Sequence, residues 1–430
     1  MEHYLGKQNI SGEHYYINLV LAFKHTAKVP IRLLTQTILK IWHQKNEQSW
    51  KHHIFGVKYY NGELNMGKVY RVAIIGTGRM GGLIEDELSA NQFSSPYGHF
   101  SAYQYIQQTE VIAVANRGAD RLQRFTDRFG ISNTYLDYQQ MIQKEKPDIV
   151  SITTPSFARA EPIIFAAEHG VKGIYAEKGL CASLEEADRI SVACHQNGTA
   201  FNWGAMRRHH DGFIRLRGAI QNGEIGQPQY AIMYAQTDLI KHHPHTLDLV
   251  SMLLGDPQPV WVEGLLAESR GTRSAPNYDV KQHAFLPPEG EEVADPMVEL
   301  FRVGYAHKGK QEMHMEGIFL PVAGRFDIDI HGTEGTAMAW DNGGMFRLRR
   351  GRGKTAEIEE KVIKPAGESP TVCTIRDIIN EIETGQCTSG NIDVTMQSVE
   401  VQFGLAHSHL QGGERIALPV VDRKLYIPGG

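Results

Sequence analysis

The chain has 430 residues, 41% of them hydrophobic and 22% charged, a balance typical of a globular protein with room for two domains. Its formal net charge of -5 gives no reason to expect a nucleic acid as partner. The four cysteines include no C-x-x-C pair, so we expect neither a metal site nor a disulfide framework, and we expect a cytoplasmic location. No apolar run approaches the roughly 18 residues of a membrane span, so we expect no membrane contact.

Residues 1–65 differ in composition from the rest, being rich in His, Lys, Gln and Asn, with one amphipathic stretch over residues 29–42 that predicts a surface helix. Two interpretations stay open. Gly62-Glu63 can be encoded by a purine-rich ribosome-binding sequence, which would make Met66 the native start. Alternatively, residues 1–65 form an N-terminal arm that packs on the body of the protein.

The strongest local signal is the run VYRVAIIGTGRMGG over residues 69–82. Its apolar part predicts a strand buried on both faces, followed by a glycine turn and a helix. Glycines spaced G-x-G-x-x-G permit a tight turn, close approach of a pyrophosphate and close helix packing, and the helix N-terminus offers N–H groups to phosphates. We expect this turn to bind a dinucleotide through Gly76, Thr77, Gly78, Arg79, Met80 and Gly81.

A second buried strand is predicted over residues 111–115, after an inserted loop over residues 89–99, and a helix over residues 119–129 follows it. In such a β-α-β unit the residue that ends the second strand lies beside the adenosine ribose. That residue is the neutral Asn116, followed by the cation Arg117. Because a carboxylate would repel a 2'-phosphate and this pair would accept one, we expect NADP rather than NAD as the cofactor.

Further strands are predicted over residues 148–153, 171–176 and 199–203, with helices over residues 159–169 and 183–196. Strands that alternate with helices predict a doubly wound parallel sheet, a Rossmann domain over residues 66–205. Ligands of such sheets bind beyond the carboxyl ends of the strands. The residues expected to meet in that crevice are Thr154, Pro155, Glu177, Lys178 and Asn202.

From residue 206 the pattern changes to long alternating runs. Strands are predicted over residues 229–236, 260–268, 298–306, 312–319 and 325–331, and helices over residues 211–221, 246–254, 371–383 and 393–411, with a loop over residues 268–295. Long strands without helical crossovers predict a mainly antiparallel sheet. We therefore expect a second α/β domain over residues 206–430.

The order of motifs resembles the Gfo/Idh/MocA oxidoreductases, the family of glucose-fructose oxidoreductase and inositol dehydrogenase. The matching stretches are AIIGTGRMG (73–81), KPDIVSITTP (146–155), AAEHGVKGIYAEK (166–178), IQNGEIGQP (220–228), HTLDLVSMLLGDP (245–257) and HGTEGT (331–336). Each is loose alone, but their common order is specific. The resemblance implies a Rossmann domain, an open sheet that forms the substrate wall and a homo-oligomer, either a dimer or a tetramer.

The resemblance also implies hydride transfer between NAD or NADP and a carbinol carbon of a sugar, sugar acid or cyclitol. The lysine of the family's E-K-P motif maps to Lys178, and the family's catalytic histidine maps to His245. Removal of a hydroxyl proton suits an imidazole with a near-neutral pKa, so His245 would be the general base. Lys178 would stabilise the developing alkoxide.

Several positions depart from the family pattern. Gly179 replaces the proline after Lys178, so we expect no constrained peptide bond there. Lys241 stands where an Asp is common, which places a cation beside the reacting centre. Arg159 replaces a frequent His. Together with the run from Arg207 and Arg208 to His209 and His210, these changes suggest a cationic pocket for a carboxylated or phosphorylated sugar. The substrate-binding candidates are Arg208, His242 and His245, and Lys241 joins Lys178 and His245 as a catalytic candidate.

Three functions remain open at this point. The first is an NAD(P)-dependent dehydrogenase of a small polyhydroxylated substrate. The second is a lyase or glycosidase that keeps its cofactor and uses transient oxidation, and the third is a dinucleotide-binding sensor without turnover.

Overall fold

The computed structural model describes residues 59–60, 63–64, 68–87, 95–235, 237–267, 277–306, 313–319, 326–364 and 367–429. The chain divides into two units, Met1–Gly67 and Lys68–Gly430. The described part of the first unit consists of two paired strands, β1 (Tyr59–Tyr60) and β2 (Glu63–Leu64). The helix expected over residues 29–42 and the start expected at Met66 lie outside the described residues.

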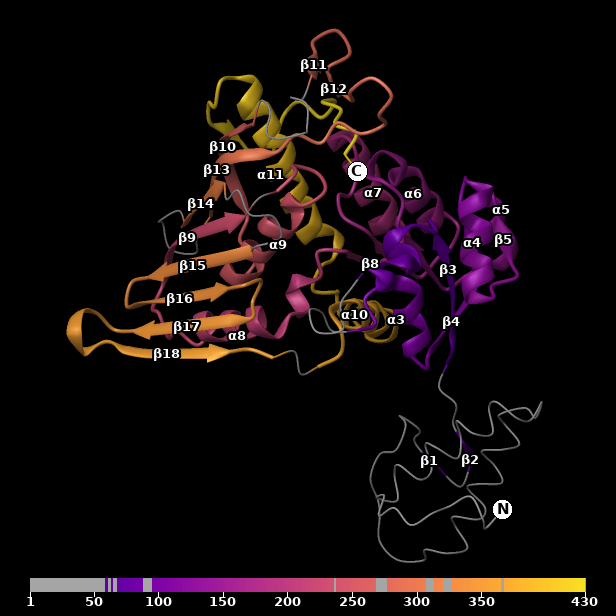
Figure 1. Ribbon diagram of the computed structural model, residues 1–430, viewed down its shortest axis with the longest axis horizontal. Coiled ribbons are helices and arrows are strands. Elements are labelled where there is room, and N and C mark those ends of the chain that lie inside the picture. Colours follow the sequence, from indigo (N-terminus) through magenta and orange to yellow (C-terminus); the bar gives the residue numbers. More distant parts are fainter. Residues whose placement is uncertain are drawn as a thin grey trace, which may run out of the picture. The chain divides into compact units, whose positions relative to one another are not determined.

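The first large sheet of the second unit is parallel throughout. Among the described residues it has six strands in the order β5-β4-β3-β6-β7-β8 (Figure 1). Their bounds are β3 (Tyr70–Ile75), β4 (Thr109–Ala115), β5 (Thr134–Tyr135), β6 (Ile149–Ile152), β7 (Gly173–Ala176) and β8 (Ala200–Trp203). The last residues of the five longer strands pair with one another, Ile75 with Ala115 and Ile152, and Ala176 with Ile152 and Trp203. Their carboxyl ends are therefore level.

Helices cover both faces of this sheet, so the predicted doubly wound fold is confirmed. One face packs with α3 (His99–Tyr105), α4 (Ala119–Phe129) and α10 (Pro370–Thr384), and the other with α5 (Tyr138–Glu145), α6 (Ala160–Glu168) and α7 (Leu184–Asn197). Alternate residues of β3 show the division, since Val72 and Ile74 join the α10 side of the core and Ala73 and Ile75 join the α6 side. The predicted domain boundary at residue 205 stays a prediction, and α10 returns to the first sheet from beyond it.

The second large sheet is mainly antiparallel, as predicted. In the described part of the chain its nine strands follow the order β18-β17-β16-β15-β9-β14-β13-β10-β19, and only β14 and β9 pair in parallel. The bounds are β9 (Pro228–Ala235), β10 (Pro259–Leu266), β13 (Val298–Tyr305), β14 (Met313–Phe319), β15 (Phe326–Gly332), β16 (Gly335–Trp340), β17 (Met345–Arg350), β18 (Glu357–Val362) and β19 (Ile416–Ala417). The expected loop over residues 268–295 contains a hairpin of β11 (Asn277–Asp279) and β12 (Ala284–Leu286).

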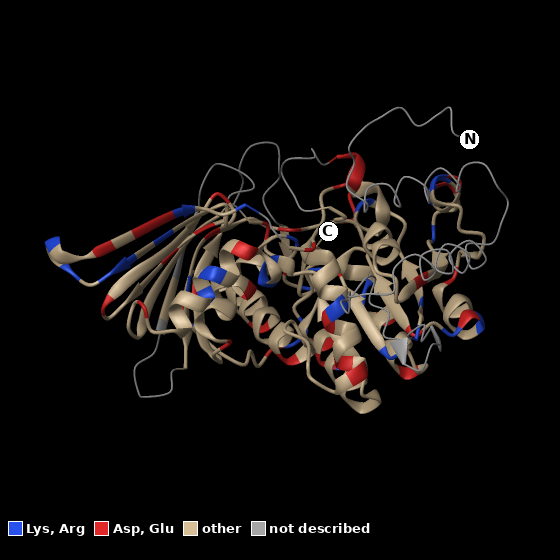
Figure 2. Ribbon diagram, turned by 90° about the horizontal axis from the view of Figure 1, so that it is seen from below, with Lys and Arg blue, Asp and Glu red and all other residues tan. Residues whose placement is uncertain are grey.

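The strands β16 to β18 were not predicted, because β17 and β18 carry charges where strand patterns call for apolar residues. The structure resolves this by cross-strand pairing. Arg347 faces Glu360 across the hairpin, and their side chains form an ion pair of 3.2 Å. Figure 2 shows basic and acidic segments side by side in this outer hairpin. Ion pairs between facing residues therefore stabilise this exposed edge of the sheet, which burial does not stabilise.

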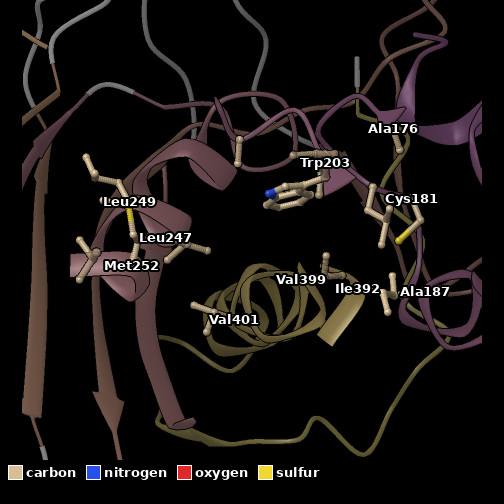
Figure 3. Close-up of a cluster of buried hydrophobic side chains, with 14 of the residues drawn as sticks. Ala176, Cys181, Ala187, Trp203, Leu247, Leu249, Met252, Ile392, Val399 and Val401 are labelled. Carbon is tan, nitrogen blue, oxygen red and sulfur yellow. The ribbon is translucent and has the colours of Figure 1, made fainter. Parts of the chain in front are cut away.

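Three helices pack on the second sheet, α8 (Asp211–Gln221), α9 (His243–Leu254) and α11 (Ile392–Leu410). Figure 3 shows Val401 of α11 toward side chains of α9, and Val399 and Ile392 toward Trp203 of the parallel sheet and Ala187 of α7. The two sheets therefore share one hydrophobic core, which fixes the segments that meet between them. Among the described residues, none of the helices has the combination of length and apolar composition needed to traverse a bilayer.

Candidate functional site

The glycine turn after β3 has the geometry that its spacing predicts. Gly76 adopts a φ of +101°, and a Cβ there would lie 2.6 Å from Oγ1 of Thr153. A Cβ on Gly81 would lie 2.4 Å from the Gly76 carbonyl oxygen, whereas a Cβ on Gly78 would meet nothing within 4 Å. The protein therefore packs tightly against Gly76 and Gly81, whereas the space beside Gly78 is open. Thr77 is fully buried there, and its hydroxyl has no partner among the described residues.

The helix expected after this turn is not regular. Residues 79–86 form two short helical turns, Arg79–Leu83 and Ile84–Asp86, and the first is interrupted at Gly82 by an extended φ of 173°. A Cβ on Gly82 would approach the rings of Phe125 and Phe129 at 2.9 and 3.0 Å, so α4 presses on this point. The prediction of a continuous helix here is therefore wrong, because packing against α4 overrides local preference.

Asn116 lies beside the glycine turn at the end of β4. Its side-chain oxygen accepts a hydrogen bond from the Thr77 N–H at 3.4 Å, and its amide donates to the Gly118 carbonyl at 3.0 Å. Arg117 is exposed next to it. The side chain of Asn116 thus joins the second strand end to the turn, at the place where a Rossmann sheet meets the ribose.

Thr154, Glu177 and Lys178 follow the adjacent ends of β6 and β7, and Pro155 begins the short turn Ser156–Ala158. Arg159 is buried beside them and donates to the carbonyls of Thr154 and Gly179. These bonds tie the two strand ends together. Arg159 is consequently a positioning cation behind the crevice, and the expectation that it lines a substrate pocket is not supported by its partners.

Glu177 is the centre of a buried hydrogen-bond chain that the sequence did not suggest. His99 Nε2 lies 3.2 Å from Glu177 Oε1, His99 Nδ1 lies 2.8 Å from the Ser151 hydroxyl, and that hydroxyl lies 3.0 Å from the Tyr103 hydroxyl. Burial raises the pKa of Glu177, but the bond from His99 and the charge of Lys178 outweigh it, so the net pKa is lowered. A histidine on the buried face of an apolar helix was the available signal.

Lys178 is half-buried, and opposing influences determine the pKa of its ammonium group. Burial lowers its pKa to about 8, with Arg159, Lys241 and Arg207 acting in the same direction and Glu177 opposing them. The Lys178–Gly179 peptide is cis, so the expectation of an unconstrained bond after Lys178 is wrong.

Gly179 has a steric reason for lacking a side chain. A Cβ there would lie 2.6 Å from the carbonyl oxygen and 2.5 Å from Cγ2 of Ile240. The backbone of the segment that carries Lys241 therefore lies directly against residue 179. Asp295 holds this segment by accepting the N–H groups of Ile240 and Lys241 at 2.8 and 2.9 Å. The two departures from the family pattern, Gly179 and Lys241, are thus one structural feature.

His245 lies in the first turn of α9, which begins at His243 and not at residue 246 as expected. Its side chain is 8% exposed, and its Nδ1 has no hydrogen-bond partner among the described residues. Burial lowers the pKa of His245 well below its usual value, and the charges of Arg207 and Lys178 lower it further. The charges of Lys178 and Arg207 therefore act on His245, and burial keeps its imidazole neutral at pH 7.

His242 stands just ahead of α9. Its Nδ1 lies 2.7 Å from Oδ2 of Asp238, a contact that favours protonation, whereas burial and the charges of Lys178 and Lys241 lower its pKa. Because several cations oppose one carboxylate, we take the neutral form, with Nδ1–H donating to Asp238 and Nε2 left as an acceptor.

Two predicted site residues have partners elsewhere. Arg208 is buried, and its guanidinium donates to both oxygens of Asp248, at 2.7 and 2.9 Å, and to Asp256 at 2.7 Å. These bonds give it a structural role instead of substrate contact. Asn202 donates to Asp377 of α10 at 3.0 Å, so its side chain points toward α10 and not toward the cofactor crevice.

The residues present fit a dinucleotide. The turn offers an open approach at Gly78 and an unpartnered hydroxyl on Thr77, with Asn116 at the neighbouring strand end. A bound pyrophosphate would receive backbone N–H groups there, and the nicotinamide end would extend toward Lys178, because the strand ends of β3, β6 and β7 are level.

Residues 70–204 match the GFO_IDH_MocA family, described as an oxidoreductase family with an NAD-binding Rossmann fold. An inositol 2-dehydrogenase of Salmonella typhimurium is 33% identical over 125 residues, 29% of this chain and 37% of that protein. A scyllo-inositol 2-dehydrogenase (NAD(+)) of Bacillus subtilis is 27% identical over 199 residues, 43% of this chain and 54% of that protein. The matched segments thus span less than two thirds of either relative.

Solved structures extend the likeness over both sheets. A levoglucosan dehydrogenase in complex with NADH and L-sorbose has a TM-score of 0.64 at 16% identity, covering 83% of this chain and all of that one. An oxidoreductase of Agrobacterium radiobacter in complex with NAD+, L-tartaric acid and magnesium has a TM-score of 0.63 at 15% identity, covering 81% of this chain and 98% of that one. At this identity the likeness concerns the fold.

Proposed function

Because this chain belongs, through residues 70–204, to the Gfo/Idh/MocA oxidoreductase family, we propose that it is a nicotinamide-dependent dehydrogenase of a secondary alcohol on a sugar, sugar acid or cyclitol. The observation that carries the proposal is the buried His245 imidazole, whose Nδ1 lacks a partner among the described residues and which feels the charge of Lys178 at the end of β7, next to the strands that hold the glycine turn. The names of the matched relatives favour a dehydrogenase over the lyase and sensor alternatives.

In this proposal the nicotinamide supplies the hydride acceptor, and the chain supplies orientation and proton handling. His245 accepts the hydroxyl proton, because it is neutral and its buried Nδ1 has no partner in the described part of the chain. In its charged form Lys178 stabilises the alkoxide. Glu177, which is hydrogen-bonded to His99 and accepts the Lys178 N–H, holds Lys178 in place. His242, oriented by Asp238, offers Nε2 to a second substrate hydroxyl.

The test uses purified full-length protein, NAD+ or NADP+, and a panel of polyols, sugars and sugar acids, with reduced nicotinamide followed by absorbance. We expect His245→Ala to lower kcat about 10²- to 10⁴-fold, as loss of a general base does. We expect His242→Ala to raise KM mainly, because a hydroxyl contact acts in substrate binding. No reduction with any member of the panel, in protein that binds cofactor, would count against a dehydrogenase.

We further propose NADP as the preferred cofactor, a homo-oligomeric assembly and a cytoplasmic location. The neutral Asn116 and the exposed Arg117 support the first, and four unpaired cysteines support the last. Fluorescence titration with NADPH and NADH tests the cofactor. Arg117→Ala is expected to weaken NADPH binding about tenfold and to leave NADH unchanged, consistent with loss of one charge-assisted bond to phosphate. Equal affinities in the native protein would remove this role.

A further inference from the structure

Three cations near the proposed reacting centre, Lys178, Lys241 and Arg207, form no direct side-chain ion pair among the described residues, although Glu177, Asp238 and Asp295 lie nearby. Arg208 pairs with Asp248 and Asp256, and Arg79 pairs with Glu87. Among the described residues, no carboxylate forms an ion pair with Lys178, Lys241 or Arg207, and Glu177 is occupied by His99. The side-chain charges of Lys178, Lys241 and Arg207 are therefore without a direct ion partner in the described part of the chain, in contrast to Arg208 and Arg79.

Arg207 is held in place with its two terminal nitrogens unused. Its Nε donates to Asn342 Oδ1 at 3.0 Å, and its guanidinium lies 3.6 Å from the ring centroid of Phe326. Within the described residues, no hydrogen bond engages the two terminal nitrogens. One hydrogen bond and one aromatic ring therefore orient the guanidinium group of Arg207. Its two terminal nitrogens, which are the donors that bind planar anions, have no partner among the described residues.

The position of Arg207 relative to the proposed base follows from shared neighbours. The ring of His245 lies 6.0 Å from the same Phe326 ring that supports Arg207. Arg207 and Lys178 are both among the charges felt by His245 and His242. The residue before Lys241 packs on Gly179, because that glycine has no side chain to exclude Ile240, and the charge of Lys241 acts on Lys178. Lys178, Lys241 and Arg207 all act on His242, and two of them, Lys178 and Arg207, also act on His245.

We propose that Arg207 and Lys241 bind a carboxylate of the substrate, next to the carbinol that Lys178 and His245 address. The ligand class is a sugar acid, in which carboxylate and reacting hydroxyl share one ring or chain. A carboxylate would engage the Arg207 fork by two parallel bonds and would give Arg207 and Lys241 a direct ion partner, which neither has among the described residues. This inference rests on the proposed function and narrows its substrate.

The experiment compares hexuronates with the corresponding neutral hexoses, and hexose phosphates form a third arm. With the full-length protein and saturating cofactor, we expect kcat/KM for the preferred hexuronate to exceed that of its hexose about 10- to 100-fold. Arg207→Gln should raise KM for the hexuronate by a similar factor, so that the ratio of kcat/KM for hexuronate to that for hexose falls about 10- to 100-fold, whereas any effect through the pKa of His245 is common to both substrates. Arg207→Lys should restore part of the affinity.

Lys241→Gln keeps the test independent of folding, because residue 241 is exposed. It should raise KM for the hexuronate by a smaller factor, since exposed charges are screened. The matched control is Arg189→Gln on α7, an exposed arginine paired with Glu161. Binding of hexuronate to the cofactor-loaded protein, measured by titration calorimetry, gives a readout without turnover.

The possible outcomes distinguish failure of the proposed carboxylate site from failure of the proposed dehydrogenase function. Hexuronate binding that Arg207→Gln weakens, without hydride transfer, would keep the anion site and overturn the dehydrogenase. If the protein oxidised neutral hexoses as well as or better than hexuronates, or preferred hexose phosphates to hexuronates, the carboxylate inference would be overturned. The dehydrogenase function would then still stand. Failure of every anionic sugar to bind would also overturn it.

Discussion

At the scale of single residues, the site depends on charges that shift one another. Lys178 is the clearest case, because burial and neighbouring cations bring its pKa to about 8 while Glu177 limits the fall. His245 is affected in the same direction and is neutral across the physiological range. One group is thus held charged and the other neutral at pH 7, which is the pairing that proton removal from an alcohol requires.

This arrangement predicts the pH dependence of activity. Lys178 is charged below about pH 8 and neutral above it, so kcat/KM should fall as pH rises through about 8. Lys241→Gln removes a positive charge that depresses the pKa of Lys178, so the alkaline limb should move upward by roughly half a unit. Because the pKa of His245 is depressed, the acid limb should lie well below pH 6.5.

The measurement is the pH profile of kcat/KM, with Lys281→Gln, an exposed lysine in the turn after β11, as the control. An alkaline limb that stays in place in Lys241→Gln would separate Lys241 electrostatically from Lys178 and would contradict the arrangement described here.

At the scale of elements, close backbone contacts decide where functional side chains stand. The segment before α9 reaches Lys178 only because Gly179 has no side chain, and Asp295 anchors its N–H groups. The Gly82 contact with α4 has the same character, since packing interrupts a helix that the local sequence favours. Elements here are placed by contacts between segments distant in sequence.

Gly179→Ala tests this placement. The added methyl would press on the Ile240 carbonyl, so we expect a loss of about 1 to 3 kcal/mol in unfolding free energy and a wider separation of Lys241 from Lys178. Gly218→Ala in α8 is the matched control, because a Cβ there meets nothing within 4 Å and alanine favours a helix. Thermal unfolding of both variants gives the comparison. Equal melting temperatures would show that the Ile240 contact is not restrictive.

At the scale of the whole molecule, the two sheets share helices as well as a core. α10 follows β18 of the second sheet in sequence but packs on the first, where Ile375 and Ile378 join Val72 and Phe100. α11 links the sheets from the other side, between α7 and α9. The Rossmann layer is therefore completed by a helix that lies about 165 residues beyond the predicted domain boundary, a distance on the order of a whole domain.

Ile375→Ala measures this dependence. Ile375 is fully buried, so the substitution should cost about 2 to 5 kcal/mol and should weaken dinucleotide binding only as far as it unfolds the protein. Ile214→Ala in α8 makes the same chemical change at a side chain that is 48% exposed, and it should cost less than about 1 kcal/mol. Urea unfolding distinguishes the two. A cost at Ile375 as small as that at Ile214 would place α10 outside the Rossmann core.

The sequence by itself determined the periodic part of this protein. Local patterns predicted the parallel sheet, its glycine turn, the antiparallel second sheet and the residues at the ends of β6 and β7. They could do so because burial of one or two faces of an element makes hydrophobic residues recur at a regular spacing. The family resemblance supplied Lys178 and His245, and the sequence suggested a cationic pocket. Tertiary structure alone decided which of its cations have carboxylate partners.

That choice was beyond local patterns because it depends on partners far away in the chain. Arg208 is removed from the pocket by Asp248 and Asp256, whereas Arg207, its neighbour in sequence, is oriented by Asn342 and Phe326 and keeps its fork free of described partners. A charge acts as a ligand-binding group or as a structural ion pair according to what lies within about 4 Å of it, and only the folded chain sets those distances.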